Sequence, residues 1–315
     1  MSRSSARSLP YDIRPAKQTE RRLLLDYLSC AKEAGVPVSR SRYVGMGGVK
    51  FYDFILMHKF VGLTNMVSLE HDQGFVGRCE FNKPYEFIRV LASSCSDFIS
   101  QDLDTSPTVY WLDYDGSISD SVINDIQALG VGAPPGSFVF VTVMAGVPRD
   151  LASKSELARL ASIKEQFGDL AAGLMESDME ESAFPTTVHG LVLRALVNAF
   201  AGRDQQSFFP SFRVAYGDGA PMITVGGYFG DAAFGAKLDE VLGEKLPFLN
   251  KAGVPYRIFS FNLTERERIL FEFACGAAAD TPEKEKLLQL GFKDKQLLDY
   301  RDLLRFVPRY FETMA

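Results

Sequence analysis

A glycine-rich turn between a short apolar strand and a helix constrains the fold more than any other feature of this sequence. The turn, Gly45-Met-Gly-Gly48, follows the apolar pair Tyr43-Val44. A second apolar segment, residues 66–69, leads into Glu70, about 25 residues after the first glycine. A strand, a helix and a second strand in this order are typical of a βαβ unit. The pattern therefore predicts an α/β fold with a mostly parallel sheet.

The same turn and acid predict a ligand site. Gly45, Gly47 and Gly48 lack a Cβ atom, so their backbone can adopt positive φ and approach a ligand closely. Glu70 lies where the acid of a nucleotide-binding βαβ unit accepts hydrogen bonds from a ribose diol. Lys50 stands where the third glycine of the dinucleotide pattern G-x-G-x-x-G would lie, which disfavours a dehydrogenase. A structural turn beside a solvated acid is the alternative interpretation.

Strands and helices alternate along the first half of the chain. Apolar segments predict strands at residues 43–44, 66–69, 87–92, 109–115 and 137–144. Helical spacing of apolar residues predicts helices at residues 16–34, 51–60, 117–129, 151–167 and 186–201, with a short one starting near 93–97. Two apolar runs on either side of Gly217-Asp218-Gly219 predict an antiparallel hairpin. The fold class is thus α/β: a doubly wound, mostly parallel sheet with a terminal antiparallel hairpin.

Three regions follow from this pattern. We expect residues 1–15 to be a flexible N-terminus, residues 16–230 to form the doubly wound domain, and residues 231–315 to form a helical C-terminal region. The last predicted helix, residues 294–312, carries a wide apolar stripe: Leu297, Leu298, Tyr300, Leu303, Leu304, Phe306 and Phe311. Such a stripe is expected to pack on the α/β domain, on a second copy of the chain or on another protein.

Composition narrows the classes of partner. The net charge of −6 and the pI of about 5.3 disfavour binding of nucleic acid by bulk electrostatics, which leaves small-molecule or protein partners. The sequence shows neither a secretory signal nor an apolar run of the ~20 residues that span a membrane. Scattered cysteines without C-x-x-C spacing fit reduced thiols in a cytoplasmic protein. We expect no metal site, since histidines and cysteines lack zinc-ligand spacing.

The order of elements resembles that of the class I S-adenosylmethionine-dependent methyltransferases over about residues 16–230. The resemblance rests on the turn at Gly45, on Glu70 and on Asp113 at the end of the fourth strand. It implies S-adenosylmethionine as cofactor, with the glycine turn around its methionine part and Glu70 at its ribose hydroxyls. The segment Leu112-Asp-Tyr-Asp-Gly116 is similar to the strand-four ending of metal-dependent O-methyltransferases, in which an aspartate can hold a divalent cation.

The sequence departs from that family in three places. Tyr43 stands where the family places an acid two residues before the first glycine. The acid that follows strand three beside the adenine is absent from residues 92–94, although Asp97 lies near. The N-P-P-Y signature of amino-methylating enzymes is absent too.

Asp113 and Asp115 are the candidate catalytic residues. A carboxylate at the carboxyl edge of a parallel sheet can act as a general base, and the alternative is an aspartate that caps the following helix. His71 can contact an adenosine ring or simply lie in a loop. Lys17 can meet the carboxylate of the cofactor or belong to a solvated basic helix end. Asp53 can meet the ammonium group of the cofactor or compensate a helix dipole.

The leading functional hypothesis is a methyltransferase that moves the methyl group of S-adenosylmethionine to a hydroxyl or amine of an unidentified acceptor. The alternative is a catalytically degenerate relative that serves as a nucleotide-binding or scaffold subunit of a multi-protein assembly.

Overall fold

The computed structural model describes residues 14–102, 104–203, 205–217, 219–249, 253–259, 263–276 and 281–308. Within these residues, eight strands form one sheet in the order β3-β2-β1-β4-β5-β7-β6-β8. The strands are β1 (Arg42–Gly45), β2 (Met66–Glu70), β3 (Ile88–Ala92), β4 (Thr108–Ser117), β5 (Ser137–Met144), β6 (Ser207–Gly217), β7 (Pro221–Gly230) and β8 (Tyr256–Arg257). β1 to β5 run parallel, so the predicted doubly wound, mostly parallel sheet is confirmed.

The terminal hairpin lies where the sequence predicts it. β7 inserts between β5 and β6 and is antiparallel to both, with Gly227 opposite Val139 and Thr224 opposite Val214. Asp218, at the predicted turn, lies outside the described residues. β8 was not predicted; it is two residues long and pairs parallel with β6.

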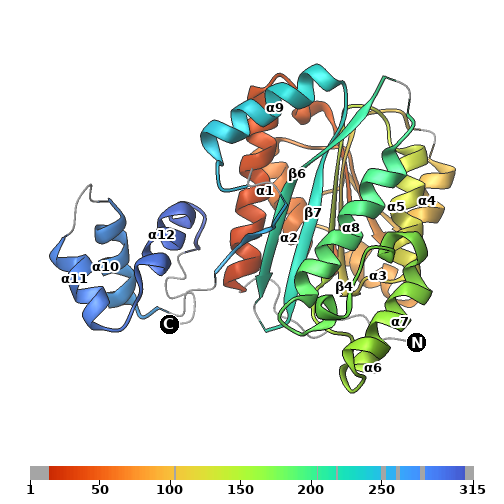
Figure 1. Cartoon of the computed structure of the whole chain (residues 1–315). Coiled ribbons are helices and arrows are strands. Elements are labelled where there is room, and N and C mark those ends of the chain that lie inside the picture. Colours follow the sequence, from red (N-terminus) through yellow and green to blue (C-terminus); the bar gives the residue numbers. More distant parts are fainter. Residues whose placement is uncertain are drawn as a thin grey trace.

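Helices cover both faces of the sheet (Figure 1). They are α1 (Pro15–Glu33), α2 (Tyr52–Leu56), α3 (Gln73–Asn82), α4 (Cys95–Gln101), α5 (Asp120–Gly132), α6 (Arg149–Ala152), α7 (Glu156–Phe167), α8 (Phe184–Phe200), α9 (Ala232–Lys245), α10 (Glu265–Gly276), α11 (Pro282–Gln289) and α12 (Asp294–Leu303). A π-helical turn, Met57–Val61, continues α2. Short 3-10 turns lie at Val38–Arg40, Gly168–Ala171 and Glu176–Met179.

Two apolar cores lie on opposite faces of the sheet. Phe138 and Phe140 of β5 point toward α1, where Tyr27 packs edge-on against both rings. Val139 and Val141 point to the opposite face, toward α5 and α8. All four β5 side chains are buried, which explains the continuous apolar run of this strand.

The C-terminal helices form a small unit with its own core, which Figure 1 shows beside the α/β domain. Phe271, Leu287, Leu297 and Tyr300 bury one another there. The end of α12 and the turn after it return to the main domain, because Leu303 and Phe306 join the core around α1. The predicted apolar stripe is therefore divided between two cores. Leu298 belongs to neither and is 50% exposed, and Phe311 lies outside the described residues.

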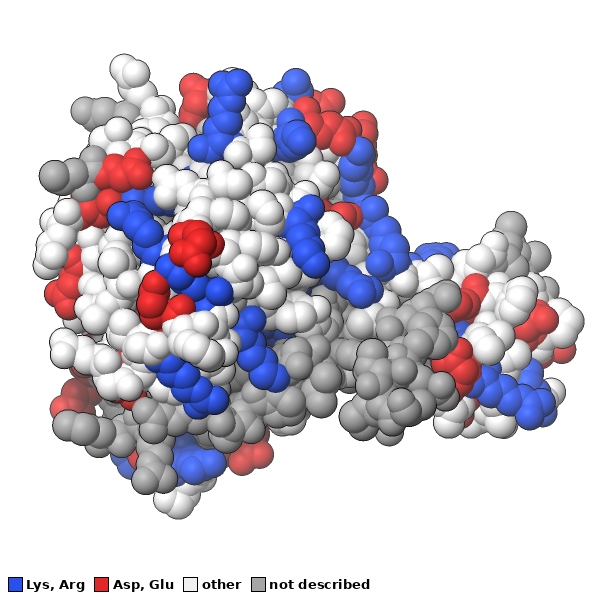
Figure 2. All heavy atoms as spheres, turned by 180° about the vertical axis from the view of Figure 1, so that it is seen from behind, with Lys and Arg blue, Asp and Glu red and all other residues white. Residues whose placement is uncertain are grey.

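The surface carries both charges. Figure 2 shows acidic and basic side chains interspersed over the face of the molecule that it presents. Among the described residues, no helix combines the length and the apolar character needed to cross a bilayer.

Candidate active site

The glycine turn lies at the carboxyl edge of the sheet, where β1 ends beside β2. Gly45 is in register with Ser68, and the Gly47 amide donates to the Ser68 hydroxyl at 3.1 Å. A Cβ atom at Gly47 would lie 2.7 Å from the Phe51 ring, and Gly48 has a φ of +51°. The sequence suggests that a ligand approaches this turn closely. The structure adds a second reason for glycine at position 47, because a side chain there would clash with the Phe51 ring.

Glu70 closes β2 on the same edge, two residues beyond Ser68. Its Oε1 accepts from the Asp72 amide at 2.9 Å, while its Oε2 lies 4.0 Å from the Cys79 thiol. A carboxylate has about four acceptor positions, so Glu70 can take further hydrogen bonds from a diol. His71 is 74% exposed in its side chain and places Nδ1 3.5 Å from Glu70 Oε1. The predicted position of Glu70 relative to the glycine turn is confirmed.

Asp113 forms the second half of the edge. It lies within β4 opposite Thr142 of β5, because the strand continues to Ser117 and does not end at Asp113 as the sequence predicted. Lys17 of α1 lies 2.8 Å from the Asp113 carboxylate and 2.7 Å from that of Glu20. The ammonium group also donates to the Tyr216 hydroxyl at 3.1 Å and sits 4.7 Å from the centre of the Trp111 ring. Lys17 and Glu20 are buried, and the Asp113 side chain is 21% exposed. Lys17 is therefore part of an internal ion-pair cluster, and a contact with a cofactor carboxylate stays a prediction.

The surroundings of Asp113 raise the pKa of its carboxyl group toward neutral pH. Burial raises the pKa of this carboxyl from its ordinary 3.8 to about 6; the nearby charges of Glu20 and Asp53 also raise it, whereas Lys17 lowers it. Burial lowers the pKa of Lys17, but Asp113 and Glu20 outweigh that effect and the net pKa is raised. The pair thus consists of a permanent cation and a carboxylate that can exchange a proton near neutral pH.

Asp53 is already paired within the protein. Arg21 Nε lies 2.5 Å from its Oδ1, and the guanidinium stacks 4.7 Å from the centre of the Tyr52 ring. Lys17 and Arg21 are basic residues near the start of α1, where the helix dipole disfavours positive charge. The carboxylates of Asp53, Glu20 and Asp113 compensate these charges. The role of Asp53 toward a cofactor ammonium stays a prediction.

Polar residues that the sequence did not single out complete this network. Thr224 donates to Glu20, the Thr142 and Thr224 hydroxyls lie 2.7 Å apart, and the Trp111 indole donates to Thr142 at 3.1 Å. The sequence signalled two parts of the network, Asp113 and the run of basic residues at the start of α1. Its threonines could not be found, because they depend on the pairing of β5 with β7.

Asp115 and Asp97 are both exposed. Asp115 is exposed, two residues beyond Asp113, where an irregularity interrupts the pairing of β4 with β5. Asp97 is exposed in the first turn of α4, where its carboxylate accepts from the Ser94 hydroxyl at 2.6 Å. Among the described residues, no group of three or more His, Cys, Asp or Glu is arranged as a metal site.

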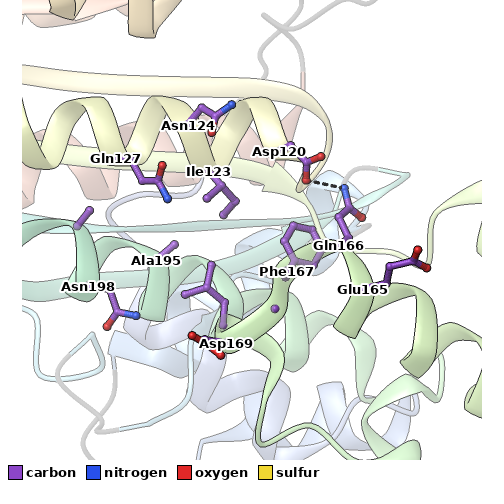
Figure 3. Close-up of a pocket in the computed structure, with 13 residues that line it drawn as sticks. Asp120, Ile123, Asn124, Gln127, Glu165, Gln166, Phe167, Asp169, Ala195 and Asn198 are labelled. Carbon is purple, nitrogen blue, oxygen red and sulfur yellow. Dashed lines mark hydrogen bonds between the residues drawn. The ribbon is translucent and has the colours of Figure 1, made fainter.

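Two cavities lie between helices on the face of the sheet opposite α1. The first, about 600 Å³ and shown in Figure 3, lies between α5, α7 and α8, and Gln166 donates to Asp120 at its edge. The second, about 500 Å³, reaches the carboxyl edge of the sheet at Ser117 and Met144. Neither is lined by Gly45, Glu70 or Asp113.

A family model described as "Putative O-methyltransferase" matches residues 9–315, almost the whole chain. The chain belongs to this O-methyltransferase family. The resemblance to class I methyltransferases that the glycine turn, Glu70 and Asp113 suggested is therefore confirmed. A search of curated proteins found none that matches the sequence.

Solved structures similar to this O-methyltransferase family member are distant in sequence. Human N-acetylserotonin methyltransferase in complex with SAM is 13% identical, with 73% of this chain and 60% of that chain covered and a TM-score of 0.35. The N-methyltransferase NodS from Bradyrhizobium japonicum in complex with S-adenosyl-L-homocysteine is 11% identical, with 70% and 90% covered and a TM-score of 0.38. A variant of LepI in complex with SAH and a substrate analogue is 10% identical, with 60% and 43% covered and a TM-score of 0.35. The chain thus spans less than two thirds of LepI and of the human enzyme.

Proposed function

We propose that this protein is an S-adenosylmethionine-dependent methyltransferase that transfers a methyl group to a hydroxyl group of its acceptor. The observation that carries the proposal is the arrangement of the carboxyl edge. A glycine turn, a strand-two acid and a largely buried carboxylate with a pKa of about 6 lie along adjacent strands there. Membership of an O-methyltransferase family favours a hydroxyl over an amine.

Each part of the edge has a chemical task in this proposal. S-adenosylmethionine supplies an electrophilic methyl group on sulfur. The free acceptor positions of Glu70 fit its ribose diol, and the turn at Gly45 to Gly48 fits its methionine part. Asp113 removes the proton of the acceptor hydroxyl, and a base with a pKa of about 6 is suited to work near neutral pH. Lys17 keeps that carboxylate in place, so alignment of the reactants supplies much of the rate.

The second cavity reaches the same edge of the sheet as Asp113, but on the opposite face. Ser117 and Met144, which face each other across β4 and β5, form its edge. The Asp113 and Thr142 pair belongs to the same two strands, just before them. Apolar side chains of α8, among them Phe184 and Leu191, line its interior. Asp113 contacts Lys17 of α1 on the other face of the sheet, so this cavity does not place an acceptor against the proposed base.

Substitution of Glu70 tests the proposal against the scaffold alternative. Loss of a charge-assisted hydrogen bond costs about 1.5–3 kcal/mol, so Glu70→Ala should weaken S-adenosylmethionine binding roughly tenfold to a hundredfold in titration calorimetry. Glu70→Gln keeps an acceptor for the Asp72 amide, so it shows the effect of losing the charge while the local structure is retained. Glu86→Ala removes an almost fully exposed carboxylate and is the matched control. A wild-type protein that gives no heat with millimolar cofactor would favour the scaffold.

A further inference from the structure

The second cavity has no task in the proposed methyl transfer, because it lies on the face of the sheet opposite α1. Its volume of about 500 Å³ falls within the range of about 300–1,000 Å³ that is typical of small-molecule sites. Ser117 and Met144, the last residues of β4 and β5, form one side, and α6, α7 and α8 form the others. The cavity is therefore large enough for a ligand of its own.

The inner wall of this cavity is apolar. Helix α8 contributes Phe184, Val188 and Leu191, while α6 contributes Leu151 and α7 contributes Ile163. Each of these five residues is at most 5% exposed and belongs to the core on this face of the sheet. The apolar part of a ligand gains free energy when it leaves water for such a wall.

The mouth of the cavity carries charged side chains. Arg149, the first residue of α6, and Lys154, between α6 and α7, line the cavity and are exposed. Lys154 donates at 3.2 Å to the hydroxyl of Ser162, which also lines the cavity. Arg149 forms no ion pair with any residue that the structure describes. Asp150, also exposed, is the single carboxylate among the described lining residues, so two cations stand against one anion.

Gln166 lies between this cavity and the first one, because it lines both. Its side chain donates to Asp120 at 3.2 Å and so joins α7 to the start of α5 (Figure 3). The first cavity presents the carboxylates of Asp120, Glu165 and Asp169, and no cation is found among its described lining residues. An anionic group is therefore favoured at the mouth of the second cavity and disfavoured in the first.

We propose that the second cavity is a binding site for a small amphipathic anion, a molecule with an apolar body and one carboxylate or phosphate group. The apolar body lies against Phe184, Val188 and Leu191, and the anionic group meets Arg149 and Lys154. A guanidinium group suits this task, because it binds carboxylates and phosphates through two parallel hydrogen bonds. Neither Glu70 nor Asp113 lines the cavity, so this site does not depend on the proposed methyl transfer.

Titration calorimetry of the full chain with hexanoate, octanoate and decanoate tests the apolar wall. Each added methylene group that leaves water should strengthen binding roughly fourfold, until the cavity is full. The charge at the mouth is tested with 1-octanol and octylammonium, which have the apolar body of octanoate. Both should bind more weakly than octanoate, because neither carries a negative charge for Arg149 and Lys154.

Substitutions at the mouth test where the anion binds. Arg149→Ala and Lys154→Ala should each weaken octanoate binding roughly fivefold, the effect of one exposed ion pair, and leave binding of 1-octanol unchanged. Lys164→Ala removes an exposed cation of α7 that does not line the cavity, and it should behave as wild type. In hydrogen exchange, octanoate should increase protection of α6 and α7 and leave α10 to α12 unchanged.

Three results would overturn the proposal. They are the absence of heat with any of the carboxylates at millimolar concentration, equal binding of octanoate and 1-octanol, and undiminished octanoate binding when Arg149→Ala and Lys154→Ala are combined. Both substituted side chains are exposed, so the variants should fold as wild type does. These titrations contain no S-adenosylmethionine, so their failure leaves the proposed function standing, and failure of the Glu70 experiment leaves this site standing.

Discussion

Asp113 is ionised at neutral pH despite an environment that opposes its charge. Burial and the neighbouring carboxylates Glu20 and Asp53 raise its pKa to about 6, and Lys17 offsets only part of this effect. Since the pKa is raised from its ordinary 3.8, the contribution of this group to stability is fully present below about pH 4. It is lost as the pH rises through about 6. A residue kept in this condition is typical of a site whose chemistry needs it.

Replacement of Asp113 by asparagine should therefore stabilise the protein at neutral pH. Asp113→Asn keeps an oxygen for Lys17 and removes the unfavourable charge. We expect its Tm at pH 7.5 to exceed that of wild type by about 2–4 °C, which corresponds to about 1 kcal/mol in a chain of this size. The difference should shrink toward pH 4, where the wild-type carboxyl is protonated in the fold. Differential scanning calorimetry measures this, with Asp115→Asn as the control. An equal loss of Tm at both pH values would contradict the account.

Single residues of the site differ in how well the sequence predicts them. Glu70 and Asp113 could be found because each directly follows an apolar run, and the carboxyl ends of such runs in a parallel sheet share one edge. Glu20 and Tyr216 could not be found, because their contacts join α1 to strands about 200 residues away in the sequence. The sequence alone does not indicate which polar residues contact one another across such a separation along the chain.

Among the elements, the long and strongly patterned ones are predicted and the short or glycine-containing ones are missed. β5 and the hairpin β6–β7 have continuous apolar runs or a turn of glycines, and both occur where expected. α3 was not predicted, because Gly74 and Gly77 interrupt its apolar pattern. Its start depends on Asp72, which accepts from the Gly74 amide at 3.0 Å. β8 forms because it pairs with β6, and a strand of two residues is too short to show a pattern in the sequence.

A small core of their own holds the helices α10 to α12 together, and we expect the stability of α10 to depend on it. Phe271 is fully buried and packs against Phe292 and Tyr300 with ring centres 5.0 and 5.1 Å away. Phe271→Ala should remove about 3–5 kcal/mol from this unit alone. Hydrogen exchange should show lost protection in α10 to α12 and unchanged protection in β4 and β5.

Phe273→Ala is the control for that experiment. Phe273 lies on the same helix and is 65% exposed, so its truncation should change protection little. Loss of protection in β4 and β5 with Phe271→Ala would show that the C-terminal unit and the α/β domain unfold together. The helices α10 to α12 would then not form a separate folding unit; α9, which also follows residue 231, already belongs to the core around α1.

At the scale of the whole molecule, two separate features meet at one edge of the sheet. The βαβ unit brings the glycine turn and Glu70 to that edge from β1 and β2. The chain before β1 folds back as α1 and brings Lys17 onto Asp113. The two features bring the carboxylates of Glu70 and Asp113 to one edge, in a protein whose net charge is −6. This combination favours a small cationic cofactor over a polyanionic partner.

Native mass spectrometry of the full chain incubated with S-adenosylmethionine tests this account most directly, because it counts bound cofactor per chain without knowledge of the acceptor. We expect a species with one S-adenosylmethionine per chain, which Glu70→Ala strongly reduces and Glu86→Ala retains. A wild-type protein that stays free of ligand at millimolar cofactor, or a Glu70→Ala protein that binds as much as wild type, would contradict it.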